Sequence, residues 1–168
     1  NTIAFSAQYD GNIDVYTIPI EGGTPNRLTW HPGNDIVRDY SPDGSSILLI
    51  SRREVFTRRY NHLYTVPVSG GLISKLKIPN AFKAKFSLDG KKVAYTPLSE
   101  PFLWWKNYRG GRVSTIWLVD RSDYSAVRIP QPEGRSNDTG PMWSGNMIYF
   151  RSDRNGEFNL FSYEISSK

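Results

Sequence analysis

A tight turn followed by an apolar strand recurs along this chain, and the recurrence limits what the chain can fold into. The first copy covers residues 40–50, the second covers 86–95, and a weaker third covers 143–150. Asp43 and Asp89, at matching places in the first two turns, are 46 residues apart. Pro, Asp and Gly favour tight turns. The apolar run after each turn is continuous, so we predict a strand that is buried on both faces.

A further strand in each unit carries an aromatic residue at an equivalent place. These residues are Tyr16, Tyr64, Trp117 and Phe161, with spacings of 48, 53 and 44 residues. A period of about 44 to 54 residues with four strands per unit is typical of a β-propeller. An ordinary antiparallel sandwich is the alternative, but it gives no reason for the same turn to return at a fixed period.

We therefore predict an all-β fold, a partial β-propeller with about four repeat units of four-stranded antiparallel blades. The units cover approximately residues 1–33, 34–79, 80–132 and 133–168 of one domain. The first unit lacks its first, innermost strand and the last unit lacks its outer strand. The expected innermost strands lie at residues 35–40, 80–86 and 138–143.

Composition argues against several kinds of site. The net charge is +5 and there are no cysteines, which excludes disulfides and thiolate metal sites. The two histidines, His31 and His62, lack neighbours at metal-ligand spacing, so we expect no metal and no cofactor. There is no Gly-x-Ser-x-Gly elbow and no run of 18 apolar residues. We predict no catalytic residue, no membrane span and no nucleic-acid partner.

Two enlarged loops are rich in basic and aromatic residues. They cover residues 51–61 and 96–114, each between the second and third strands of its unit. Long insertions on one propeller face usually mark the binding face. The loops could dock on other domains or subunits, guide peptides, or be solvated. Docking is the preferred interpretation, and Arg and Trp enrichment fits an interface as well as it fits peptide guidance. The candidate binding or docking residues are Arg52, Arg53, Arg58, Arg59, Trp104, Trp105, Lys106, Tyr108, Arg109 and Arg112.

The Ser-Pro-Asp-Gly turn resembles the propeller repeats of TolB, of dipeptidyl peptidase IV relatives and of tricorn proteases. Residues 105–112, which read Trp-Lys-Asn-Tyr-Arg-Gly-Gly-Arg, resemble a run in the N-terminal propeller of tricorn proteases. Residues 7–29, 35–53 and 151–159 are also similar to that propeller. The resemblance implies a six-bladed, non-catalytic parent propeller, followed by a second propeller, a PDZ module and a C-terminal serine protease domain. Six blades need about 270 residues, more than this chain has.

The function that this resemblance implies is a non-catalytic segment of a tricorn-like serine protease, which gates peptide substrate or product passage and mediates assembly. Its expected partners are the remaining domains or subunits of the protease, with peptides as a further possibility, and its expected location is the cytoplasm. The alternative is a TolB-like protein–protein interaction module in the periplasm.

The incomplete first and last units lead to one further expectation. We read the chain as a piece of a longer protein; if it is the whole molecule, it should self-associate through its open ends. The outward faces of those units would then expose an apolar patch. The residues expected on these faces are Phe5, Tyr16, Ile148, Phe150 and Phe161.

Overall fold

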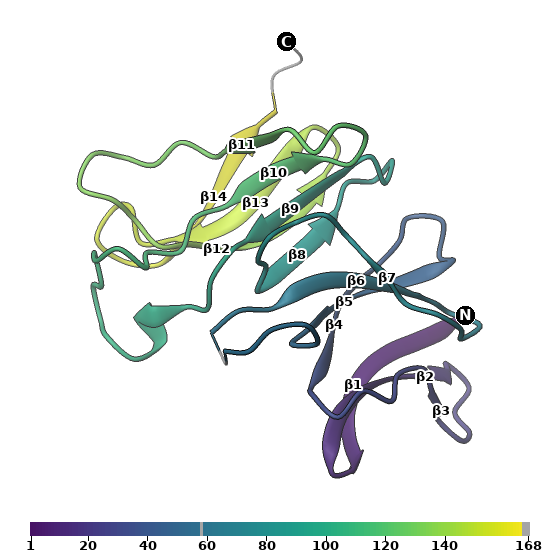
Figure 1. Cartoon of the computed structure of the whole chain (residues 1–168). Helices are drawn as coiled ribbons and strands as arrows, with labels where there is room; N and C mark the ends of the chain where they lie inside the picture. Colours follow the sequence, from purple (N-terminus) through teal and green to yellow (C-terminus); the bar gives the residue numbers. More distant parts are fainter. Residues whose placement is uncertain (58, 166–168) are drawn as a thin grey trace. The chain divides into compact units, whose positions relative to one another are not determined.

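The computed structural model describes residues 1–57 and 59–165, and these residues form 14 strands and one short 3₁₀ helix (Figure 1). No helix among them is long and apolar enough to cross a membrane. The elements are β1 (Thr2–Asp10), β2 (Asn12–Pro19), β3 (Asn26–Arg27), β4 (Asp35–Tyr40), β5 (Ser46–Ser51), β6 (His62–Pro67), β7 (Ser74–Lys75), β8 (Lys83–Phe86), β9 (Lys92–Thr96), η1 (Pro101–Leu103), β10 (Trp117–Asp120), β11 (Ala126–Arg128), β12 (Asp138–Ser144), β13 (Met147–Ser152) and β14 (Asn159–Glu164).

The strands form four antiparallel sheets, and each sheet pairs only strands that follow one another in the sequence. We call them blade 1 (β1-β2-β3), blade 2 (β4-β5-β6-β7), blade 3 (β8-β9-β10-β11) and blade 4 (β12-β13-β14). Strand β5 lies between β4 and β6, as its continuous apolar run predicts, and its residues 47–50 are at most 1% exposed. The predicted all-β architecture of successive blades is confirmed.

The recurrent turn of blade 2 is closed by its own side chains. Gly44 donates its backbone N–H to the Ser41 carbonyl at 2.8 Å, and its φ of 69° is the left-handed conformation that glycine tolerates. The Asp43 carboxylate accepts the Ser41 hydroxyl at 2.6 Å and the Ser45 backbone N–H at 3.0 Å. The Ser41 hydroxyl, followed by the donors of Ser45, lowers the pKa of Asp43 to about 2.

The turn of blade 3 repeats these bonds with nearly the same lengths. Asp89 accepts the Ser87 hydroxyl at 2.6 Å and the Lys91 backbone N–H at 3.0 Å. Gly90 also has a φ of 69°. The sequence repeat is therefore a repeat of one hydrogen-bonded turn, and it holds the first two strands of blades 2 and 3 in register.

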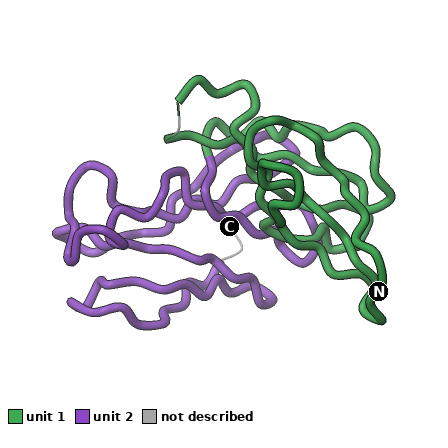
Figure 2. Tube along the Cα trace, turned by 90° about the horizontal axis from the view of Figure 1, so that it is seen from below, with its two compact units in different colours: residues 1–80 green, residues 81–168 purple. Residues whose placement is uncertain are grey.

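The chain divides into two compact units, residues 1–80 and 81–168, and each has a core between its two blades (Figure 2). In the first unit, side chains of blades 1 and 2 meet around Val15, Ile47 and Tyr64. In the second unit, side chains of blades 3 and 4 meet around Ile116, Ile148 and Phe150. Within each unit the blades thus pack face to face.

The core of the second unit corrects one expectation. Ile148 and Phe150, predicted on the outward face of the last unit, are 0% exposed and pack against blade 3, and Phe161 packs on the same cluster. Successive side chains of a strand point to opposite faces. The register therefore places Met142 and Leu160 on the other face, where they are 46% and 63% exposed.

The outward face of blade 1 is partly covered by its own aromatic residues. Tyr16 is only 4% exposed, because its ring contacts the rings of Phe5 and Tyr9 at centroid distances of 5.8 and 4.9 Å. Tyr9 itself is 62% exposed and lies at the end of β1. These ring contacts bury Tyr16, whereas Ile3, on the same face of β1, is 52% exposed.

Candidate docking site

A cluster of polar side chains lies where β4 begins and β5 ends, at one end of the strands of blade 2. Arg53 donates from Nη2 to Oδ2 of buried Asp35 at 2.5 Å and from Nε to the Ser51 hydroxyl at 3.0 Å. Its guanidinium lies 5.3 Å from the centre of the Tyr64 ring. Burial raises the pKa of Tyr64 to about 12. The contacts of Arg53 are therefore made within blade 2 itself.

Blade 4 contains the same cluster. Arg154 donates from Nη2 to Asp138 at 3.2 Å and from Nε to the Ser152 hydroxyl at 3.1 Å. Its guanidinium lies 4.9 Å from the ring centre of Phe150 and 5.1 Å from that of Phe161. The sequence analysis missed this repeat. Its signal is an Asp at the start of the first strand and a Ser-x-Arg at the end of the second.

Blade 3 departs from this pattern, because a long insertion follows β9. The insertion covers residues 97–116 and contains the 3₁₀ helix η1, which begins at Pro101. A proline suits the first turn because its missing N–H would have no partner there. Just before η1, Glu100 is 5% exposed, pairs with Lys83 Nζ at 2.7 Å and accepts the Thr139 hydroxyl. This first anchor ties the insertion to β8 and β12.

A second anchor lies near the other end of the insertion. Arg109 Nη1 pairs with Asp153 Oδ2 at 2.6 Å, and Arg109 Nη2 donates to the Asp153 carbonyl at 3.3 Å. Asn137 donates to the same carboxylate from its backbone at 2.7 Å and from Nδ2 at 3.0 Å. Burial by itself would raise the pKa of Asp153, but these donors lower it overall. The Tyr-Arg-Gly-Gly run is therefore fixed to the residues just before β12 and just after β13 of blade 4.

The first glycine of that run, Gly110, is explained by Tyr108. Its ring folds back over Gly110, where an added Cβ would lie 2.6 Å from Tyr108 Cζ. The Tyr108 hydroxyl accepts the Arg112 backbone N–H at 3.3 Å. The Tyr108 ring also stacks on Trp105 with centroids 5.8 Å apart and an interplanar angle of 29°. The tyrosine therefore links both limbs of the insertion.

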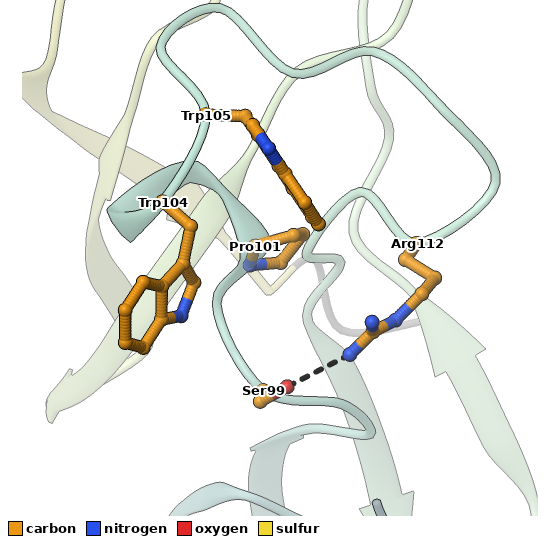
Figure 3. Close-up of a pocket in the computed structure, with 5 residues that line it drawn as sticks. All are labelled: Ser99, Pro101, Trp104, Trp105 and Arg112. Atoms are coloured by element: carbon orange, nitrogen blue, oxygen red, sulfur yellow. Dashed lines mark hydrogen bonds between the residues drawn. The ribbon is translucent and has the colours of Figure 1, made fainter.

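An open hollow of about 430 Å³ lies between these limbs (Figure 3). Trp105 and Arg112 point toward the space beside Pro101 and Ser99, and Trp104 lies next to them. Arg112 Nη2 donates to the Ser99 hydroxyl at 3.0 Å. Indole faces and a guanidinium around one hollow can hold a flat or apolar group together with an anion.

The remaining predicted residues are not among those that line this hollow, or they lie outside the described residues. Arg52 and Arg59 are exposed in the loop after β5, and Arg58 lies outside the described residues. Lys106 is exposed on the insertion. Among the described residues, no three His, Cys, Asp or Glu side chains gather as metal ligands would.

Comparison with known proteins identifies the architecture. The tricorn protease N-terminal beta propeller domain matches residues 1–168. The chain belongs to this family. Tricorn protease homolog 1 of Streptomyces coelicolor is 30% identical over 162 residues, which cover 95% of the chain but 15% of that relative. Tricorn protease of Thermoplasma acidophilum is 26% identical, again over 15% of its length. The tricorn propeller chain thus spans a small part of the curated relatives it matches.

Solved structures show the same fold. The crystal structure of the tricorn protease superposes with a TM-score of 0.74 at 24% identity, covering 99% of this chain and 16% of that one. A putative TolB from Agrobacterium tumefaciens superposes with a TM-score of 0.68 at 20% identity, covering 99% of this chain and 52% of that one. The predicted partial propeller and the resemblance to tricorn are confirmed.

Proposed function

We propose that this tricorn propeller segment is a non-catalytic part of a serine protease in the cytoplasm, where it gates peptide passage and docks on other domains or subunits. The observation that carries the docking role is the doubly anchored insertion of blade 3. Two ion pairs with buried carboxylates, one at Glu100 and one at Arg109, hold a loop whose tip exposes Trp104 and Trp105. A rigid loop with exposed tryptophans is suited to binding a partner.

The test is made on the full-length protein that carries this chain. The double variant Trp104→Ala/Trp105→Ala changes exposed side chains, so the fold should remain intact. We expect hydrolysis of a short chromogenic peptide to be unchanged, because the propeller takes no part in the chemistry. Degradation of long peptides should slow, or the assembled state should weaken in sedimentation.

The matched control is Trp30→Ala, which removes a tryptophan that is 64% exposed in the first unit. Two results would count against the proposal. The first is a full-length protein without peptidase activity. The second is a double variant that equals the Trp30 control in both long-peptide degradation and assembly.

A TolB-like interaction module of the periplasm is the second candidate. The TM-score of 0.68 to a putative TolB over 99% of the chain supports its fold. This candidate predicts that the full-length protein binds a partner protein and hydrolyses no peptide. The peptidase assay above therefore separates the two candidates.

A further inference from the structure

The tip of the blade 3 insertion exposes three consecutive apolar side chains. Leu103, Trp104 and Trp105 are 66%, 82% and 58% exposed. Single exposed apolar residues are normal on a protein surface, whereas contiguous ones mark interaction sites. Tryptophan is also over-represented among the residues that dominate binding energy. The tip therefore has the composition of a binding surface.

The hollow beside this tip is held in shape before any partner arrives. Pro101 forms its floor as a buried residue of η1, and Trp105 is stacked on Tyr108. The anchors at Glu100 and Arg109 hold the two limbs that line it. A preformed site loses less conformational entropy on binding than a mobile loop does.

The charge around the hollow is positive. Glu100 is the only acidic residue between 96 and 114, and Lys83 already pairs with it. Arg112 lines the hollow and donates to the neutral Ser99 hydroxyl. Within the described part of the chain it has no carboxylate in ion-pair range. A guanidinium in that setting has donors to offer to an incoming carboxylate.

A second hollow of about 490 Å³ adjoins the first along the chain. It is lined by Leu98, which precedes Ser99 of the first hollow, and by Val113, which follows Arg112 of the first hollow. Exposed Arg128 and Arg135 complete its rim. The rim of this second hollow therefore carries two further cations, which an acidic ligand long enough to reach it would meet.

We propose that the Trp104–Trp105–Arg112 hollow binds an acidic segment of a partner protein. An aromatic or proline side chain of that segment covers the indole rings, and a nearby Asp or Glu carboxylate pairs with Arg112. The inference rests on the docking function proposed above and names the chemistry of the partner. A protein segment fits better than a nucleic acid, because the net charge of the whole chain is only +5.

The test is a binding titration on the full-length protein with the peptide Gly-Glu-Phe-Pro-Glu-Gly-amide, labelled with fluorescein through its N-terminal amine. Both ends are blocked, so the only carboxylates of the peptide proper are side chains. One control peptide replaces both Glu by Lys, a second replaces Phe-Pro by Gly-Gly, and a third probe is labelled oligothymidylate. Mass spectrometry checks that each peptide stays intact. Binding is read by anisotropy, so it does not depend on peptidase activity.

We expect the acidic peptide to bind at least about tenfold more tightly than either control peptide and than the oligonucleotide. Trp104→Ala and Arg112→Gln should each weaken it by about tenfold, whereas Trp30→Ala should not. Arg112→Glu should reverse the preference and favour the Lys peptide. The proposal is overturned by equal binding of the probes, by tighter binding of the oligonucleotide, or by no binding of the acidic peptide at about 1 mM. A protein without peptidase activity that still binds as expected would refute the protease assignment and leave this site standing.

Discussion

The Arg109–Asp153 pair makes the sharpest prediction, because one partner is buried and the other is partly exposed. The side chains of Arg109 and Asp153 are 33% and 3% exposed. Arg109→Met keeps the aliphatic stem and removes the charge. Leaving a buried charge unpaired costs about 3–5 kcal/mol, but Asn137 still donates two hydrogen bonds to this carboxylate. We therefore expect a loss of about 2–3 kcal/mol in the free energy of unfolding.

For a chain of this length, such a loss lowers the melting temperature by roughly 4–12 °C. Urea unfolding and calorimetry measure it, and Arg112→Met is the matched control, because Arg112 donates to a neutral hydroxyl. The control should change stability by no more than about 0.5 kcal/mol. A double-mutant cycle with Asp153→Asn should give a coupling of at least about 1 kcal/mol. An Arg109→Met variant that is as stable as the control would refute the anchor.

The same pair should respond to acid. The folded pKa of Asp153 lies below its ordinary value. Its contribution is therefore present above the unfolded pKa of about 3.9 and is lost as the pH falls through the lower folded value. The stability gap between wild type and Arg109→Met should narrow over that window. A gap that stays constant from neutral pH down to strong acid would show that the carboxylate charge is not involved.

Two further predictions concern the turn and the outward faces of the first and last blades. Asp43→Asn should be less stable than wild type above pH about 3.9, and the difference in stability should shrink as the pH falls through the folded pKa of Asp43, about 2. Urea unfolding at several pH values measures this difference. A difference that does not depend on pH would show that the charge of Asp43 does not stabilise the turn. If the 168 residues are the whole molecule, they should self-associate through their exposed outer faces, and Leu160→Glu should weaken this association in sedimentation velocity, because Leu160 is 63% exposed. A wild-type monomer at high concentration would argue against it.

Much of the fold could be predicted because its signals are local. The turns at Asp43 and Asp89 are closed by neighbours within two residues, so the residue types themselves specify the turn. The apolar run after each turn is long enough to indicate a buried strand. Which side chains of β13 point to the core could not be predicted in this way. Ile148, Tyr149 and Phe150 are all apolar or aromatic, so no alternation with polar residues marks the buried face.

The candidate site was only partly predictable for a related reason. Exposed tryptophans and arginines in a long loop are visible in the sequence, but the side chains that hold the loop come from elsewhere. Arg109 and Asp153 are 44 residues apart, and Glu100 and Thr139 are 39 apart. No local pattern joins such pairs. The sequence therefore could not distinguish an arginine that pairs with a buried carboxylate, such as Arg53, from one that lines the hollow, such as Arg112.

The order of strand pairing has a consequence for how the chain reaches its native state. Every sheet joins strands that are consecutive in the sequence, and the described strands include no crossover between sheets. Apart from the β9–β10 hairpin, which closes over the long insertion of blade 3, the hairpins can therefore close over shorter loops, at a small entropic cost, before the rest of the chain has been made. Synthesis on the ribosome is slow compared with hairpin formation, which takes microseconds. Each blade can thus form its hairpins as it emerges, and within each unit the apolar face of the second blade meets the blade made just before it.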